Sequence, residues 1–152
     1  MDFDGWLNRA WDEHAHDPTG VADRIVAEGM ALATADTELA ALARLAHHLF
    51  GDHLAHPDDG RALLQRLAAR TAAGDGTRSA VRLLDASLVL TGGGEPRAGL
   101  GASERIRVTA MAASNLGERD AARAGALLRE ALVAAEASRS GSRERGACRR
   151  RR

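Results

Sequence analysis

Residues 104–132, ERIRVTAMAASNLGERDAARAGALLREAL, carry the strongest constraint on the fold of this chain. Two stretches with apolar residues at helical spacing flank a short polar break at Gly117–Asp120. Small residues stand where two antiparallel helices would have to touch. The pattern predicts an α-helical hairpin.

The rest of the chain follows the same helical periodicity, and no segment shows convincing strand alternation. Asp36 or Thr37 is predicted to cap the third helix, and Ser103 the sixth. Five glycines among the eleven residues Thr91–Gly101 predict the one long loop. We therefore expect an all-α protein of seven helices, at about residues 4–16, 21–33, 37–55, 59–73, 78–90, 104–116 and 119–137.

Composition limits both the core and the cellular context. The 152 residues suffice for one domain, and with aromatic residues at 3% the core must be built from Ala, Leu and Val. All 21 basic residues are Arg, which is typical of a GC-rich bacterial genome. No signal peptide or membrane-length apolar run is visible, so a cytoplasmic location is expected.

The formal charge of zero conceals an acidic body and a basic tail. Residues 139–152 hold seven arginines and a single acidic residue, Glu144. This tail has no apolar periodicity and is predicted to be disordered, which leaves residues 1–138 as one helical domain. The acidic body disfavours nucleic-acid binding, and only Arg149–Arg152 could bind a nucleic acid weakly.

A recurring set of offsets suggests internal repetition. From an origin at a small residue, the positions 12, 16 and 19 residues later are mostly small or apolar. The origins Gly29, Ala68 and Ala112 each follow this rule, and an aliphatic residue stands four positions before each. The three sets are Gly29, Ala41, Leu45 and His48; Ala68, Ala80, Leu84 and Ser87; and Ala112, Ala124, Leu128 and Ala131.

At these positions the chain resembles the tetratricopeptide repeat family, although its origins lie 39 and 44 residues apart and the family repeat is about 34 residues long. The resemblance implies stacked antiparallel α-hairpins in a right-handed superhelix, and an irregular α-bundle is the alternative. It also implies a non-enzymatic scaffold that binds another protein or peptide in a groove lined by Gln65, Ala69, Thr109 and Ala113. A homodimer formed through an exposed Ala/Leu face is a further possibility.

Histidines suggest a different activity. On a regular helix His48, Asp52 and His56 form one stripe, which could supply three ligands to a divalent metal, with His14 or Glu13 as a fourth. The alternative interpretation makes His53 a core or hairpin-junction histidine and His47 a solvated one, with His48 and Asp52 paired without metal.

Catalytic and cofactor motifs are weak. The single cysteine, Cys148, lies in the predicted tail, and no serine stands in a nucleophile-elbow motif. The glycine-rich loop lacks the Gly-Lys-Ser/Thr of a phosphate-binding loop. We therefore predict a protein that is not an enzyme and needs no cofactor.

Overall fold

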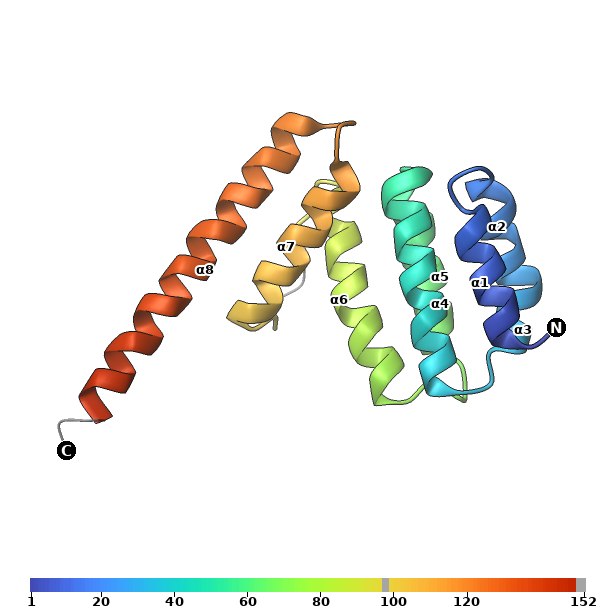
Figure 1. Cartoon of the computed structure of the whole chain (residues 1–152), viewed down its shortest axis with the longest axis horizontal. Helices are drawn as coiled ribbons and strands as arrows, with labels where there is room; N and C mark the ends of the chain where they lie inside the picture. The colour runs from blue at the N-terminus through green and yellow to red at the C-terminus, as the bar shows by residue number, and fades with distance from the viewer. Residues whose placement is uncertain (97–98, 150–152) are drawn as a thin grey trace. The chain divides into compact units, whose positions relative to one another are not determined.

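The computed structural model describes residues 1–96 and 99–149, and these residues form helices without a strand (Figure 1). The expected seven helices are all present. Two of them contain a π-helical stretch, here η1 and η2, which divides the labelling but not the helix. The elements are α1 (Phe3–Glu13), α2 (Pro18–Arg24), η1 (Ile25–Gly29), α3 (Met30–Leu32), α4 (Asp36–His48), η2 (Leu49–His53), α5 (Pro57–Ala68), α6 (Asp75–Thr91), α7 (Ala102–Leu116) and α8 (Ala121–Arg149).

The chain divides into two compact units after Pro96, inside the glycine-rich loop. This differs from the single domain predicted for residues 1–138. Each unit is described below by itself.

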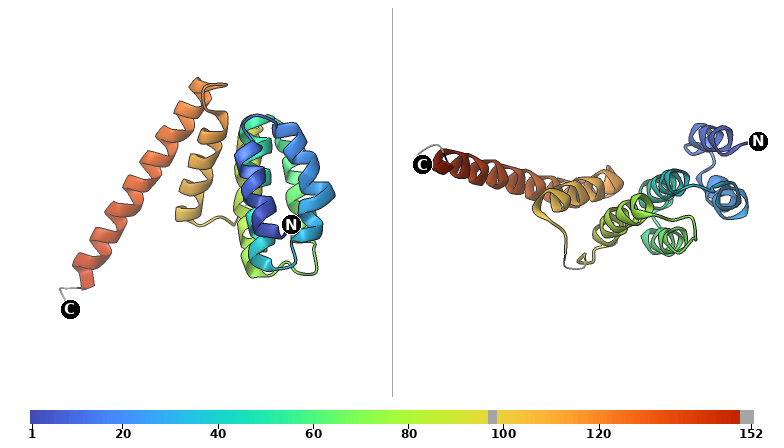
Figure 2. Two further views of the ribbon diagram at one scale, coloured as in Figure 1. Left: turned by 45° about the vertical axis from the view of Figure 1, so that its right-hand side comes forward. Right: turned by 90° about the horizontal axis from the view of Figure 1, so that it is seen from below.

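In the first unit, α4 is the central helix. Seen end-on in Figure 2 (right), it lies between the α2–α3 segment and the pair formed by α5 and α6. Its apolar positions recur every three or four residues, which places them on the faces that meet these neighbours. The large side chains that are fully buried include Val21, Ile25, Leu39, Leu42, Leu45, Leu49, Leu64, Leu67 and Leu88. Aliphatic side chains thus form this core, as the composition predicted.

Aspartates cap the first two helices, whereas the predicted cap of α4 differs from the observed one. Asp2 and Asp17 accept hydrogen bonds from the amides of Gly5 and Gly20 and so cap α1 and α2. The N-cap of α4 is Ala35, so the predicted caps Asp36 and Thr37 lie one and two residues too late. Asp36 instead accepts hydrogen bonds from the amides of the turn at residues 74–77, which joins α5 to α6.

The second unit is a helical hairpin. Ala113 and Leu116 of α7 pack against Ala124 and Leu127 of α8, and the turn between the helices includes Gly117 at a φ of +46°. The N-cap of α7 is Gly101 rather than the predicted Ser103, and Glu104 accepts a hydrogen bond from the Gly101 amide.

α8 continues to Arg149, well past the predicted end at about Ala137. The tail predicted to be disordered is therefore helical over residues 139–149, while residues 150–152 lie outside the described part of the chain. Arg, Ala and Glu are good helix formers, and adding residues to an existing helix costs far less than nucleating one. The lack of apolar periodicity in this segment therefore did not indicate disorder.

The offsets that suggested repeats fall partly on helix contacts. Ala112, Ala124 and Ala131 are buried in the second unit, whereas Leu128 is 54% exposed. In the first unit Leu84 and Ser87 are buried, and α5 packs on α6 as the predicted hairpin requires. The tetratricopeptide-like superhelix itself stays a prediction.

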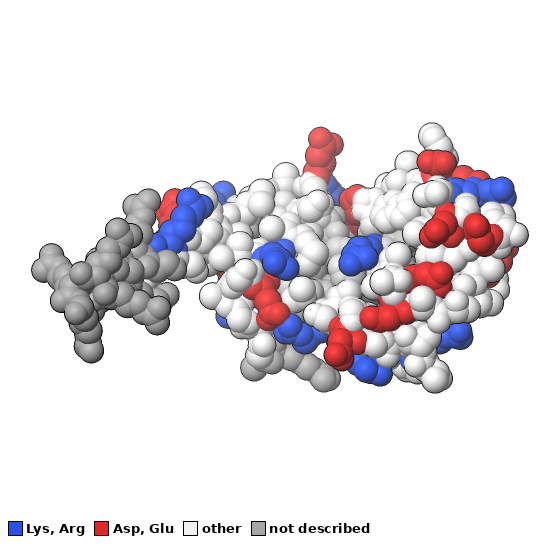
Figure 3. All heavy atoms as spheres, turned by 60° about the horizontal axis from the view of Figure 1, so that its bottom comes forward, with Lys and Arg blue, Asp and Glu red and all other residues white. Residues whose placement is uncertain are grey.

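Charge is distributed unequally. Residues 1–96 contain 15 acidic residues and 8 arginines. Acidic side chains are prominent over the N-terminal helices at the right of Figure 3. Within the described residues, none of the helices is both long and apolar enough to span a bilayer.

Candidate metal centre

Three histidines from two separate parts of the first unit converge on one point. His14 is the C-cap residue of α1, His48 ends α4 and His53 ends η2. One nitrogen from each ring lies within 4.8 Å of the others. The Nε2 atoms of His48 and His53 are 3.2 Å apart, and the three ring centroids are separated by 4.9 to 5.0 Å.

The π-helical turn η2 explains why His53 joins this cluster. In an α-helix, residues five apart point about 140° away from one another. In η2 the Leu54 amide donates to the Leu49 carbonyl oxygen at 2.8 Å, an i to i+5 hydrogen bond that widens the turn. Residues five apart, such as His48 and His53, then lie close together.

The nitrogen atoms that face away from the cluster have acceptors nearby. His14 Nδ1 contacts the Trp11 carbonyl oxygen, which can only accept a hydrogen bond, so this nitrogen carries the proton. The Nε2 atom of a neutral His14 is then left with a free lone pair. One carboxylate oxygen of Asp52 is 3.9 Å from His48 Nδ1 and also 3.9 Å from His53 Nε2, close enough to influence the orientation of both rings.

The cluster is partly shielded from water. The Trp11 ring packs on the rings of His14 and His48, with centroid distances of 5.3 and 5.4 Å. The side chains of His48 and His53 are 34% and 25% exposed. Burial, followed by the neighbouring His53 and His14, lowers the pKa of His48, although Asp52 opposes this shift. Imidazole lone pairs that bind protons weakly stay available to a metal ion.

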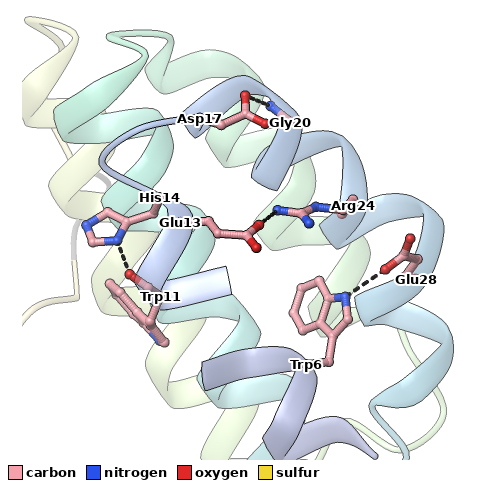
Figure 4. Close-up of polar contacts among 8 residues, drawn as sticks. All are labelled: Trp6, Trp11, Glu13, His14, Asp17, Gly20, Arg24 and Glu28. Atoms are coloured by element: carbon pink, nitrogen blue, oxygen red, sulfur yellow. Dashed lines mark hydrogen bonds and ion pairs between the residues drawn. The ribbon is translucent and has the colours of Figure 1, made fainter. Parts of the chain in front are cut away.

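Contacts along α1 hold His14 in position (Figure 4). The Trp6 indole nitrogen donates to Glu28 at 2.9 Å, and Glu13 pairs with Arg24. His14 and Trp11 leave α1 on the side away from these contacts. One face of α1 therefore docks on the α2–η1 segment, which leaves the other face to meet the end of α4.

The predicted metal stripe is corrected in one member. His48 and Asp52 lie together as expected, but His56 pairs with Asp59 at 3.3 Å at the start of α5 and is absent from the cluster. The sequence-based stripe assumed 100° per residue through Ala55, and η2 breaks that periodicity. Glu13, the alternative fourth ligand, is engaged by Arg24, whereas His14 does join the cluster.

The prediction for His47 was wrong, since this residue is not solvated but only 8% exposed. Of the two positions predicted for His53, the core is excluded, because the residue is exposed where η2 ends before α5. His47 Nε2 lies 3.0 Å from the Ser87 hydroxyl oxygen. A histidine next to a serine resembles part of a catalytic triad, but Ser87 is fully buried and so cannot meet a substrate. This pair joins α4 to α6.

The residues predicted to line a groove lie in different surroundings. Gln65 of α5 and its C-cap residue Ala69 are exposed, whereas Thr109 and Ala113 of α7 are buried. Ala69 lines a shallow pocket of about 510 Å³ in the first unit. The side chains of Cys148 and of the arginines at 149–152 lie outside the described part of the structure.

No protein-family model, curated protein or solved structure matches this chain. Chemical interpretation of the histidine cluster therefore depends on its own geometry. Three imidazoles with converging nitrogen atoms can share a proton or bind a metal ion.

Proposed function

We propose that this protein binds one divalent transition-metal ion, with zinc as the leading candidate, through His14, His48 and His53. The observation that carries the proposal is the convergence of three imidazole nitrogens within 4.8 Å, from helices that are distant in sequence. Among proteins, His is the commonest nitrogen ligand of zinc.

The nitrogen separations suit a metal ion. Tetrahedral zinc with Zn–N bonds of about 2.05 Å separates two ligand nitrogens by about 3.3 Å. The Nε2 atoms of His48 and His53 already lie 3.2 Å apart. Closing the widest possible pair from 4.8 Å requires a shift of roughly 1.5 Å, which rotation about the broad χ2 torsion of histidine can supply.

The outward contacts also match those of metal ligands. A histidine that binds a metal through one nitrogen usually directs the other nitrogen to a carboxylate or carbonyl group, which orients the ring. His14 directs Nδ1 to the Trp11 carbonyl, and His48 directs Nδ1 toward Asp52. Asp52 is thus proposed to orient His48 rather than to bind the metal.

The donor set selects a class of metal. Imidazole nitrogens suit Zn²⁺, Cu²⁺ and Ni²⁺, whereas Mg²⁺ and Ca²⁺ prefer oxygen ligands. A bound ion would connect α1 to the α4–η2 helix, since His14 comes from the former and His48 and His53 from the latter. We infer a binding or structural role, because the three ligands join the end of α1 to the α4–η2 helix, on which α1 also packs.

Calorimetric titration of the chelator-treated protein with Zn²⁺ tests the proposal. We expect one equivalent to bind, and each of His14→Ala, His48→Ala and His53→Ala to lose most of the affinity. His56→Ala is the matched control, because His56 belongs to the predicted stripe but pairs with Asp59. Absence of stoichiometric binding, or an equal loss in His56→Ala, would remove the proposal.

Trp11 provides a second readout. Its ring lies 5.3 and 5.4 Å from those of His14 and His48, so bound Cu²⁺ should quench its fluorescence. The chain contains two tryptophans, Trp6 and Trp11. Trp11→Phe should therefore lose most of the quenching at one equivalent while it keeps the Trp6 emission.

Binding of a partner polypeptide is the second candidate function. It is supported by the tetratricopeptide-like offsets and by the pocket beside Ala69, which is also lined by Ala33, Thr34, Arg70, Thr71 and Ala72. Affinity capture with the whole chain tests this candidate. Ala69→Glu should abolish recovery of the partner, whereas the control Thr19→Glu, at an exposed site on α2, should not. Equal recovery with both variants would count against the pocket.

A further inference from the structure

α8 carries apolar side chains on two different faces. Ala124, Leu127 and Ala131 face α7 and are buried or partly buried there. Leu128, Leu132 and Val133 are 54%, 56% and 66% exposed. At 100° per residue, these three exposed side chains span an arc of about 140° that begins beside the buried face. A helix with apolar residues this far around its circumference is typical of one packed on more than one side.

Three charged residues of the segment 125–140 lie within the exposed arc: Arg139, about 20° from Leu132 on the side of Leu128, and the pair Arg129 and Glu136. Relative to Leu132, Arg129 is rotated by about 60° and Glu136 by about 40° in the same direction. They stand seven residues apart, on either side of Leu132 and Val133. When a second copy of this helix lies antiparallel to the first, each of these charges therefore meets the opposite charge of the other copy.

We propose that the exposed face of α8 binds a second copy of this chain, with the two α8 helices antiparallel. A two-fold axis between Leu132 and Val133 places Arg129 of each copy opposite Glu136 of the other. Arg129 lies three residues before Leu132, and Glu136 lies three residues after Val133, so the two positions are equally far from the axis. The axis thus forms the same ion pair twice and brings the exposed apolar side chains of both copies together.

The alternative parallel arrangement is disfavoured by the same residues. A parallel two-fold pair in register would place Arg129 against Arg129 and Glu136 against Glu136, and like charges in contact are destabilising. Charge complementarity therefore selects both the partner, a second copy, and the direction of the helix.

The interface is small, which sets its expected strength. The paired segment, residues 125–140, spans about 24 Å of helix. Three exposed apolar side chains per copy bury far less than the roughly 1,600 Å² of a standard interface. We therefore expect a reversible dimer with a dissociation constant in the micromolar range.

Sedimentation velocity of the whole chain, with a chelator to exclude metal bridging, tests the proposal. From about 1 µM to 1 mM the average mass should rise from 16.0 kDa toward twice that value. Leu132→Glu should keep the protein monomeric throughout, with an unchanged helical circular dichroism spectrum.

Charge reversal distinguishes the antiparallel pair from other dimers. Arg129→Glu and Glu136→Arg should each weaken the dimer about tenfold, because each change affects two contacts. The double variant should recover the original affinity. Arg44→Glu, at an exposed site on α4, controls for the change in net charge.

A chain that stays monomeric at the highest concentration would overturn the proposal. So would a dimer that is indifferent to Leu132→Glu, or one weakened by both reversals but not recovered in the double variant. These outcomes are independent of metal binding, which concerns the other unit.

Discussion

His47 Nε2 lies 3.0 Å from the hydroxyl oxygen of Ser87, and this contact joins α4 to α6 inside the first unit. His47 is 8% exposed and Ser87 is fully buried. Burial lowers the pKa of His47 to about 4, and the neighbouring His48 adds to the shift. The native protein therefore holds this imidazole neutral where an unfolded chain would protonate it.

Stability should fall with acid for this reason. The folded pKa of His47 lies below the unfolded value of 6.5, so its contribution is present above pH 6.5 and is lost as the pH falls to about 4. The full difference corresponds to about 3 kcal/mol of unfolding free energy. Urea unfolding at pH 7 and pH 4.5, with chelator present, measures it. His47→Gln should show a shallower dependence than the parent, and an unchanged dependence would contradict the assignment; His16→Gln, at an exposed site, is the control.

A second prediction concerns Asp36, which should affect stability at lower pH than His47 does. Hydrogen bonds from the side chain and amide of Thr77 and from the amides of Gly74 and Gly76 lower its pKa to about 2. The stabilisation is present above pH 3.8 and is lost as the pH falls from 3.8 to 2. Asp36→Ala should lower the melting temperature at pH 7 and flatten the acid dependence between pH 2 and 4. Asp75→Ala removes the same charge from the exposed start of α6 and should do neither.

Periodicity was sufficient to predict most of the fold. Except at the end of α8, each of the seven helices was expected within about five residues of its observed bounds, because apolar spacing marks the helices and Pro57-Asp58 marks the start of α5. The end of α8 was missed because a polar helix end shows no apolar pattern. The division after Pro96 falls in a loop whose glycines were evident, yet their effect on contacts was not.

The candidate site was predicted only in part. His14 and His48 were both considered as ligands, but His53 was assigned to the core or to a hairpin junction. Its position depends on the π-helical turn η2, and such a turn follows from packing rather than from local propensity. The only available signal was the number of histidines between residues 47 and 56. His47 was assigned to solvent because its partner could not be seen locally: Ser87 lies 40 residues away in sequence.

Gly29 is predicted to be essential for docking α1. A Cβ atom at this position would lie 2.6 Å from Cη2 of Trp6, whose indole already donates to Glu28. Gly29→Ala should therefore displace the Trp6 ring and cost about 1–3 kcal/mol of unfolding free energy, measured by urea unfolding. Ala27→Val adds volume at an exposed position of the same π-helical stretch. An equal loss in both variants would show that the close approach to Trp6 is not the cause.

Asp52 should affect metal affinity without binding the metal. Its carboxylate lies 3.9 Å from His48 Nδ1, where it can orient the ring. Asp52→Asn is expected to weaken Zn²⁺ binding about 10- to 100-fold, measured by competition with a coloured chelator. Asp59→Asn changes the carboxylate beside His56 and should leave the affinity unchanged. Complete loss of binding in Asp52→Asn would instead make Asp52 a direct ligand.

A bound metal ion should stabilise the attachment of α1 above all. His14 alone contributes from α1, so binding couples this helix to His48 and His53 on the neighbouring one. At about 100 times the dissociation constant, Zn²⁺ should raise the unfolding free energy by about 2.7 kcal/mol. Amide hydrogen exchange should show the largest gain in protection within residues 3–13, because release of α1 breaks the site. His14→Ala should abolish both effects, whereas His16→Ala, an exposed histidine two residues later, should retain them. Protection that rises only around residues 48–53 would mean that the ion binds without connecting α1.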